Sequence, residues 1–230
     1  MLFHGFQKMT MLDFPGNVAC TVFTPGCNFR CPFCHNALLV TRTNDNEIYT
    51  EEDILSYLEK RSGVIEGICI SGGEPLMHDD IFDFIKKVRK LGVLVKLDTN
   101  GSYPDKLKSL IDDGLVDYVA MDIKNSPEKY AVTAGVKSFD FEPVRRSVEI
   151  LLEGKVGYEF RTTVVKEFHT PQDMVGIGNL IRNADKYFLQ QFIESEGNIE
   201  QGLTPLDKAE MEELRLSIVN FVKNVELRGI

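Results

Sequence analysis

Three cysteines lie close together in the first quarter of the chain. Cys27, Cys31 and Cys34 follow an apolar run that is typical of a β-strand. A [4Fe–4S] cluster contains four irons, and each iron takes a ligand that is usually a cysteine sulfur. A group of three cysteines leaves one iron free to bind another molecule. The spacing therefore predicts a reactive cluster rather than a simple electron store.

A zinc site is the main alternative for these cysteines. Structural zinc sites take four Cys or His ligands, which commonly come as two separated pairs along the chain. His35 directly follows Cys34, and this position makes it an awkward fourth ligand. We therefore favour the cluster.

The composition of the 230-residue chain favours a cytoplasmic protein. With 43% apolar residues the chain can bury one substantial core, so we expect a single domain over residues 1–230. A net charge of −9 without a Lys/Arg run argues against nucleic-acid binding. We expect no signal peptide and no membrane, because no apolar run approaches the roughly 20 residues that a span needs. Five cysteines without a disulfide framework indicate a reducing compartment.

Strand and helix patterns alternate along the whole chain. We expect strands at residues 18–24, 64–71, 93–98, 116–123, 156–165 and 187–193. We expect helices at residues 50–60, 79–91, 104–113, 143–153, 171–184 and 207–222. Six such units predict an α/β fold with a mostly parallel sheet. Polar residues at the strand ends favour a partial (β/α)6 TIM-like barrel over an open sheet, because barrel enzymes hold their sites there.

Polar motifs follow the predicted strands at the edge where the cysteines lie. Gly72-Gly73-Glu74-Pro75 follows the second strand, and its two glycines allow the backbone to approach a ligand closely. Gly-Gly turns are common between a strand and a helix, so the motif alone is weak evidence for a binding loop. Its position one strand–helix unit after the cysteines makes it strong evidence. Later strands are followed by Asp98, Asp122 with Lys124, and Arg161. These charges either bind a zwitterionic ligand or pair with one another at the rim.

Taken together, these motifs resemble those of the radical S-adenosylmethionine (SAM) enzymes, and among them the glycyl-radical-enzyme activases. The resemblance covers nearly the whole chain. It implies the radical SAM fold and an oxidoreductase whose [4Fe–4S] cluster, held by Cys27, Cys31 and Cys34, reductively cleaves SAM to a 5′-deoxyadenosyl radical. That radical would generate a glycyl radical on a partner enzyme under anaerobic conditions. The implied partner is anaerobic ribonucleoside-triphosphate reductase, and the implied electron source is a low-potential donor such as flavodoxin or ferredoxin.

The resemblance also assigns SAM contacts to residues of this chain. It places Phe33 and His35 near the adenine, and it places the amino group of SAM at Gly72, Gly73 and Glu74. It directs Lys124 and Arg161 to the carboxylate and ribose.

Two further assignments are specific to the activase branch. A monovalent cation, sodium or potassium, is implied at Asp98, Thr99 and Asp122. The activases also have a SAM-contacting histidine after the sixth strand, where this chain has Gln190-Gln191-Phe192. Either Gln191 replaces that contact or SAM is held differently.

Two other functions remain open from the sequence. One is a radical SAM enzyme that acts on a small molecule, as 7-carboxy-7-deazaguanine synthase does. The other is an electron carrier or iron–sulfur assembly module, in which the Gly-Gly-Glu-Pro motif would have no purpose. Cys20 and Cys69 lie singly inside strands and are expected to be buried apolar groups, so we expect no second cluster.

Overall fold

The computed structural model describes residues 1–41 and 47–230. Its strands are β1 (Leu2–Phe3), β2 (Phe6–Thr10), β3 (Ala19–Thr24), β4 (Tyr49–Thr50), β5 (Gly67–Gly72), β6 (Leu94–Thr99), β7 (Tyr118–Asp122), β8 (Gly157–Val164), β9 (Lys186–Gln191) and β10 (Asn224–Arg228). Its α-helices are α1 (Ala37–Thr41), α2 (Glu51–Lys60), α3 (Ile81–Lys90), α4 (Pro104–Asp112), α5 (Tyr130–Thr133), α6 (Glu142–Leu152), α7 (Pro171–Leu180) and α8 (Lys208–Ile218). Two short 3₁₀ helices are η2 (Pro75–Met77) and η3 (Pro127–Lys129).

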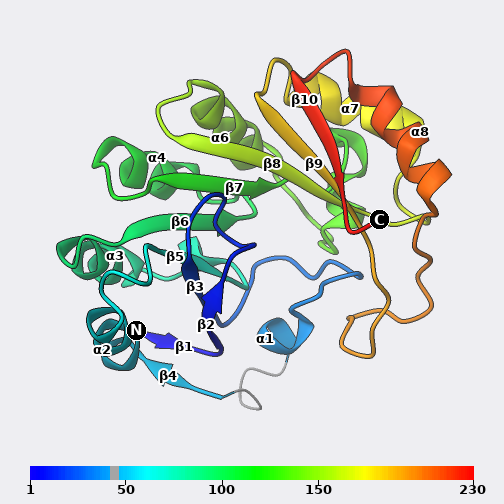
Figure 1. Ribbon diagram of the computed structural model, residues 1–230. Coiled ribbons are helices and arrows are strands. Elements are labelled where there is room, and N and C mark those ends of the chain that lie inside the picture. Colours follow the sequence, from blue (N-terminus) through cyan, green and yellow to red (C-terminus); the bar gives the residue numbers. More distant parts are fainter. Residues whose placement is uncertain (42–46) are drawn as a thin grey trace.

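The main sheet has the strand order β10-β9-β8-β7-β6-β5-β3-β2. Strands β3 and β5 to β10 are parallel, and β2 pairs with β3 in the antiparallel direction. The sheet is curved but does not close, because β2 and β10 form its two edges (Figure 1). The predicted partial barrel with a mostly parallel sheet is therefore confirmed.

Six crossover helices connect the parallel strands and cover the convex outer face of the sheet (Figure 1). Local capping fixes where several of them begin. Thr50 and Asp53 form a reciprocal capping box at the start of α2, as the sequence predicts, and Asp207 and Glu210 do the same for α8. None of the helices in the described residues combines the length and the apolar content that crossing a bilayer requires.

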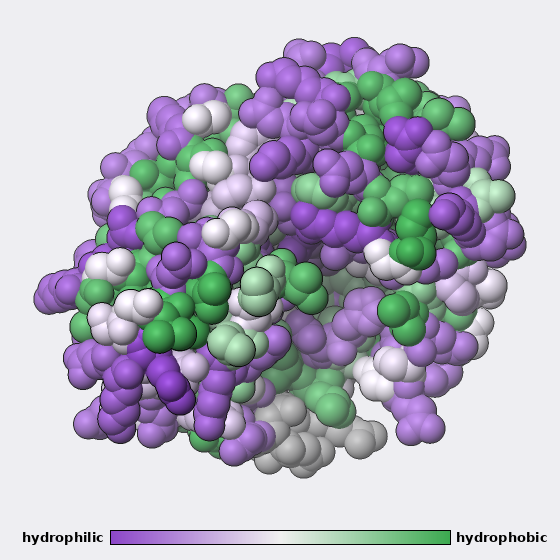
Figure 2. All heavy atoms as spheres, viewed as in Figure 1, coloured by the Kyte–Doolittle hydropathy of each residue, from purple (hydrophilic) through white to green (hydrophobic). Residues whose placement is uncertain are grey.

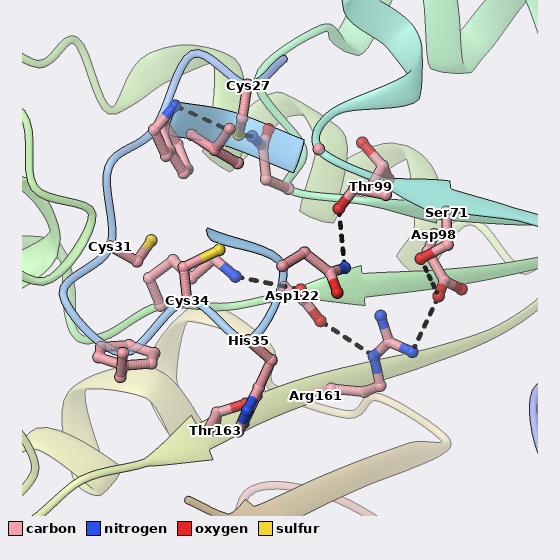
Figure 3. Close-up of a pocket in the computed structure, with 18 of the residues that line it drawn as sticks. Cys27, Cys31, Cys34, His35, Ser71, Asp98, Thr99, Asp122, Arg161 and Thr163 are labelled. Carbon is pink, nitrogen blue, oxygen red and sulfur yellow. Dashed lines mark hydrogen bonds and ion pairs between the residues drawn. The ribbon is translucent and has the colours of Figure 1, made fainter. Parts of the chain in front are cut away.

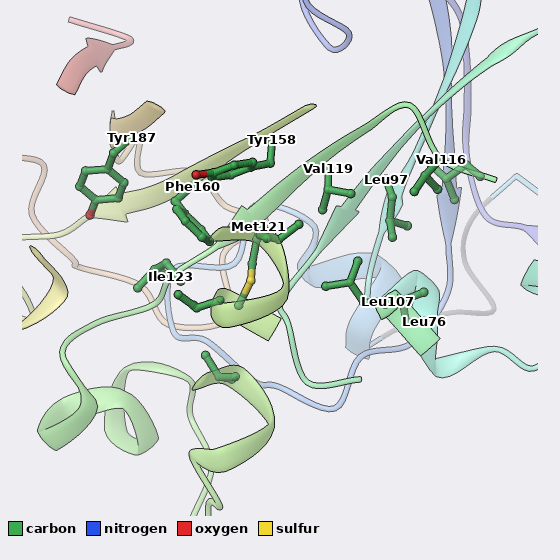
Figure 4. Packing of buried hydrophobic residues seen from close by; sticks show 14 of the residues in the cluster. Leu76, Leu97, Leu107, Val116, Val119, Met121, Ile123, Tyr158, Phe160 and Tyr187 are labelled. Carbon is green, nitrogen blue, oxygen red and sulfur yellow. The ribbon is translucent and has the colours of Figure 1, made fainter. Parts of the chain in front are cut away.

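The apolar core lies between these helices and the outer face of the sheet. Val119 and Met121 of β7 alternate with residues of the inner face and pack beside Leu97 of β6 and Phe160 of β8 (Figure 4). Each fully buried side chain of this size stabilises the fold by about 1.5–3 kcal/mol relative to exposure. The core holds the strands in register, and this aligns the loops at their carboxyl ends.

The predicted elements are found with small shifts at their ends. The six predicted strands correspond to β3 and β5 to β9, and the six predicted helices to α2, α3, α4, α6, α7 and α8. The last two helices end at Leu180 and Ile218, earlier than residues 184 and 222. Strands β2 and β10 were not predicted, and β10 adds a seventh parallel strand beside β9.

Candidate active site

A pocket opens at the carboxyl ends of the parallel strands, on the concave side of the sheet. The face shown in Figure 2 is hollowed, and hydrophilic and hydrophobic residues both border the hollow. The pocket has a cavity volume of about 210 Å³ and is open to solvent at its mouth. Ligand pockets typically enclose about 300–1,000 Å³, so a larger ligand would extend through the open mouth. Residues from β5, β6, β7, β8 and β9 line it together with the cysteine loop.

The three predicted cluster cysteines line this one pocket. Cys31 is buried, whereas Cys27 and Cys34 are partly exposed, and all three are free thiols (Figure 3). Burial raises the pKa of Cys27 to about 11 and that of Cys31 to about 12, while the Lys124 ammonium opposes this rise. The thiols are therefore protonated at neutral pH, and metal binding would displace their protons.

These sulfurs fit an iron–sulfur cluster. Soft thiolate ligands favour iron–sulfur clusters and other thiophilic metals, and Cys27 already receives a hydrogen bond from the backbone N–H of Phe29 at 3.3 Å. The nearby charge of Lys124 favours the thiolate form of Cys31 and Cys34. The donor set and its surroundings therefore suit an anionic, sulfur-ligated group.

The glycines Gly72, at the end of β5, and Gly73, directly after it, are required by the cysteine loop itself. A Cβ atom on Gly73 would lie 1.6 Å from the carbonyl oxygen of Gly26, and Gly72 has a φ of +120°. The Glu74 N–H donates to the same Gly26 oxygen at 2.9 Å. Only glycine lets these two loops touch, and both glycines also line the pocket.

Glu74 is fully buried and links two loops rather than facing the open pocket. Its carboxylate accepts hydrogen bonds from the Thr99 hydroxyl at 2.8 Å, the Asn100 N–H at 2.7 Å and the Leu76 N–H at 3.0 Å. Burial raises the pKa of Glu74 to about 7, although these three donors favour its charged form. Glu74 thus holds the ends of β5 and β6 together beneath the cysteine loop.

A charged network forms the inner wall of the pocket (Figure 3). Arg161 Nε donates to Asp122 at 2.9 Å, and Arg161 Nη1 lies 3.4 Å from Asp98. Lys124 lies 3.1 Å from Asp122, and Lys96 pairs with Asp98. Burial opposes ionisation of Asp122, but Arg161 and Lys124 outweigh it and lower its pKa to about 2. Lys96 is buried and does not line the pocket, so the two cations and two carboxylates that do line it balance in charge.

The predicted cation ligands are already engaged with neighbouring groups. Asp98 and Asp122 accept from the cations just described, and the Thr99 hydroxyl donates to Glu74. Within residues 1–41 and 47–230, no group of three or more His, Cys, Asp or Glu side chains is arranged around a single metal ion; this includes the three cysteines, each of which would bind a different iron of a cluster. The monovalent cation stays a prediction.

The two residues predicted to lie near the adenine both line the pocket. Phe33 packs against Phe168 and His169 with ring centroids 5.7 and 6.2 Å away. The His35 ring lies 5.9 Å from Phe192, which directly follows β9. Burial and the charge of Lys124 lower the pKa of His35, so its imidazole is neutral at pH 7.

The structure places Gln191 outside the pocket. Its side-chain amide donates to the backbone carbonyl of Leu206 at 2.6 Å, and the preceding Gln190 lines the pocket instead. Successive residues of a strand point to opposite faces, so Gln190 rather than Gln191 faces the pocket, and the SAM contact of Gln191 stays a prediction. Gln190 is the polar group that this strand offers.

Several pocket residues were not singled out from the sequence. Ser71 donates to Asp98 at 3.0 Å, and Thr163 lines the wall two residues after Arg161. Asn100 contacts the cysteine loop, and its position between Asp98 and Gly101 in the strand-end motif was the available signal.

Comparisons with known proteins agree with this geometry. The family description "Radical SAM superfamily" matches residues 21–180. The chain is 29% identical to a Methanocaldococcus jannaschii protein whose name provisionally assigns it as a glycyl-radical enzyme activating enzyme, with 100% of this chain and 96% of the relative covered. It is 27% identical to the pyruvate formate-lyase-activating enzyme of Clostridium pasteurianum, with 80% and 78% covered.

Two other similar proteins have a lower sequence identity to this chain and are covered over only part of their own length. The GTP 3′,8-cyclase of Clostridium perfringens is 26% identical, with 90% of this chain and 65% of the relative covered. The structure of Streptococcus suis SuiB bound to S-adenosylmethionine superposes with a TM-score of 0.69 at 14% identity, covering 91% of this chain and 52% of that chain. The latter similarity shows the fold alone. Because the family match spans well over half of the residues and includes the three cysteines, the chain belongs to the radical SAM superfamily.

Proposed function

We propose that this protein is a glycyl-radical enzyme activating enzyme that holds a [4Fe–4S] cluster on Cys27, Cys31 and Cys34. The observation that carries the proposal is the meeting of these three sulfurs with the Gly72-Gly73 edge and the charged wall of Lys124 and Arg161 in one pocket. A relative named as an activating enzyme of this kind matches over 96% of its own length, which supports the same function.

The residues of the pocket would divide the binding of SAM among them. When bound, the cluster supplies the electron that cleaves the sulfonium bond of SAM. The exposed backbone of Gly72 and Gly73 offers polar groups to the amino group of SAM. Lys124 and Arg161 are the two cations of the pocket wall that a carboxylate can contact, and Arg161 presents planar N–H donors to it.

The aromatic side of the pocket suits the adenine. Phe33 and the neutral imidazole of His35 both line the cavity, and flat apolar or weakly polar rings stack well against a purine. Phe168 and Phe192 pack behind them and fix their positions. This side would orient the nucleoside, while the charged wall would hold the amino-acid part.

The partner and the electron source are the finer parts of the proposal. We propose anaerobic ribonucleoside-triphosphate reductase as the protein that receives the glycyl radical and a flavodoxin or ferredoxin as the donor, in the cytoplasm. The sheet is open between β2 and β10, so a polypeptide loop can approach the pocket from the side. The monovalent cation at Asp98, Thr99 and Asp122 belongs to this part as well.

Activity on a small molecule is the alternative function. The similarity to GTP 3′,8-cyclase supports it, but it covers only 65% of that relative's length. A small substrate would have to share the pocket with SAM, whereas a protein loop can reach it from outside.

An anaerobic assay with purified components tests the proposal. The reconstituted protein should convert SAM to 5′-deoxyadenosine in a reaction that needs a reductant, and addition of the reductase should produce a glycyl radical signal in the electron paramagnetic resonance (EPR) spectrum. Production of 5′-deoxyadenosine with no radical on any glycyl-radical enzyme offered would overturn the activase function. Loss of SAM cleavage upon Lys124→Met, with the iron content unchanged, would support the assigned role of the charged wall.

A further inference from the structure

Asn100 contacts the cysteine loop with its side-chain amide and is almost fully buried, at 5% exposure. Its nitrogen Nδ2 lies 3.7 Å from Cys27 Sγ and 2.9 Å from Asn28 Oδ1. Its oxygen Oδ1 accepts the Ser102 N–H at 2.9 Å. Because the oxygen is committed to this backbone donor, the NH₂ group has to face the sulfur.

The backbone of Asn100 is held just as firmly. Its N–H donates to Glu74 Oε2 at 2.7 Å, and the Glu74 N–H in turn donates to the carbonyl of Gly26 at 2.9 Å. Gly26 immediately precedes Cys27, so these contacts form a closed ring through three loops. The amide of Asn100 therefore has a fixed position relative to the Cys27 sulfur.

We propose that Asn100 is a positioning residue that orients Cys27 and tunes the reduction potential of the cluster through an N–H···S hydrogen bond. The inference rests on the proposed function, because it requires Cys27 to be a cluster ligand. The Phe29 N–H already donates to the same sulfur, and Asn100 adds a second donor from a different part of the chain. Hydrogen bonds to cluster sulfurs stabilise the more negative, reduced state and so raise the potential.

The chain offers a matched control for this contact. Asn125 is fully buried, donates through Nδ2 to Thr133 Oγ1 at 2.9 Å and to the carbonyl of Phe168 at 3.0 Å, and accepts the Ser126 N–H at 2.7 Å. It thus makes as many side-chain hydrogen bonds as Asn100, but these bonds reach hydroxyl and carbonyl oxygens instead of a sulfur. Replacing it should affect stability without changing the environment of the cluster.

The test compares the reconstituted wild-type protein with Asn100→Ala, Asn100→Asp and Asn125→Ala, using EPR-monitored redox titration under anaerobic conditions. At the wild-type midpoint potential, we expect Asn100→Ala to show an about tenfold lower ratio of reduced to oxidised cluster, which equals about 59 mV for one electron. Asn100→Asp should show a larger decrease, because a carboxylate would face the sulfur. Asn125→Ala should titrate as the wild type does.

Midpoint potentials of both Asn100 variants that equal the wild-type value would overturn the inference, and so would an equal shift in Asn125→Ala. Iron content and the melting temperature of the metal-free proteins are measured alongside. If Asn100→Ala binds fewer than four irons while an equally stable Asn125→Ala binds four, the orienting role is supported. Failure to activate a glycyl-radical enzyme would refute the proposed function but would leave this comparison of potentials intact.

Discussion

The two faces of the curved sheet differ sharply in chemistry although they are built from the same strands. On the outer face, side chains such as Leu97 and Met121 pack into the apolar core. On the inner face, their immediate neighbours Asp98 and Asp122 join the charged network of the pocket. A strand alternates its side chains between two faces, so each of these strands contributes to both environments.

The outer face therefore determines the stability of the fold, and the inner face determines the chemistry of the pocket. Apolar burial on the outer face supplies free energy of folding, whereas buried ion pairs contribute little net stability because the charges lose their hydration. The inner face is therefore free to hold charges and sulfurs that suit a ligand. Substitutions on the two faces should accordingly affect different measured quantities.

The largest expected effect separates a cysteine that lines the pocket from a cysteine on the outer face of the sheet. Cys31→Ala should lower reductive SAM cleavage by on the order of a thousandfold or more, because the cluster loses a ligand. Cys20 packs in the apolar core, so Cys20→Ala should retain the activity and lose about 1 kcal/mol of stability. Chromatography of 5′-deoxyadenosine measures the activity of both variants. An equal loss of product in the two would contradict the different roles assigned to Cys31 and Cys20.

A substitution in the core should change stability alone. Leu97 is fully buried on the outer face, so Leu97→Ala should lower the free energy of unfolding by about 2–5 kcal/mol. Leu12 is 90% exposed, and Leu12→Ala serves as the control, with a change within about 0.5 kcal/mol. Denaturant unfolding measures both. A stable Leu97→Ala protein with an altered cluster potential would show that the two faces are coupled.

The pH dependence of stability should report the buried carboxyl of Glu74. Burial raises its pKa from 4.5 to about 7, so the folded protein binds more protons than the unfolded chain between these values. The free energy of unfolding should therefore fall as the pH rises from 4.5 to 7, by about 3 kcal/mol relative to Glu74→Gln.

Urea unfolding of the metal-free proteins across this pH range gives the difference between the two curves. The contributions of the other titrating groups to stability are the same in both proteins, so they cancel in this difference. Parallel curves would mean that the three hydrogen-bond donors keep Glu74 ionised throughout.

The smallest expected effect concerns the geometry of the charged wall. Arg161→Lys keeps the charge but loses the planar fork of donors, so the KM for SAM should rise about tenfold. Arg228 makes a comparable double contact with Glu159, at 2.8 and 3.1 Å, away from the residues that line the pocket. Arg228→Lys should leave the KM unchanged, and a similar rise in both variants would assign the effect to general loss of packing.

The sequence was sufficient for the parts of the structure that repeat a simple pattern. Apolar and β-branched runs located β3 and β5 to β9, and the Thr50 capping box located the start of α2. The strand β10 was missed because Val225 and Leu227 are the only apolar residues of a five-residue segment. Its pairing with β9 depends on contacts across the fold that a local pattern does not contain.

The site was predictable where residue type alone determines the chemistry. Cys27, Cys31 and Cys34 were expected to meet, and they line one pocket. Gln190 rather than Gln191 lines the pocket, because a shift of one residue along a strand reverses the side-chain direction. The contact between Asn100 and Cys27 joins residues 73 positions apart, and it could be found only from the arrangement of the loops.

Anaerobic reconstitution followed by iron analysis and EPR spectroscopy with and without SAM tests whether Cys27, Cys31 and Cys34 hold a cluster with one open iron. We expect four irons per chain and a reduced-cluster signal that changes when SAM is added, because one iron lacks a cysteine ligand. A zinc ion in place of the irons, or a cluster whose signal is unaffected by saturating SAM, would contradict it.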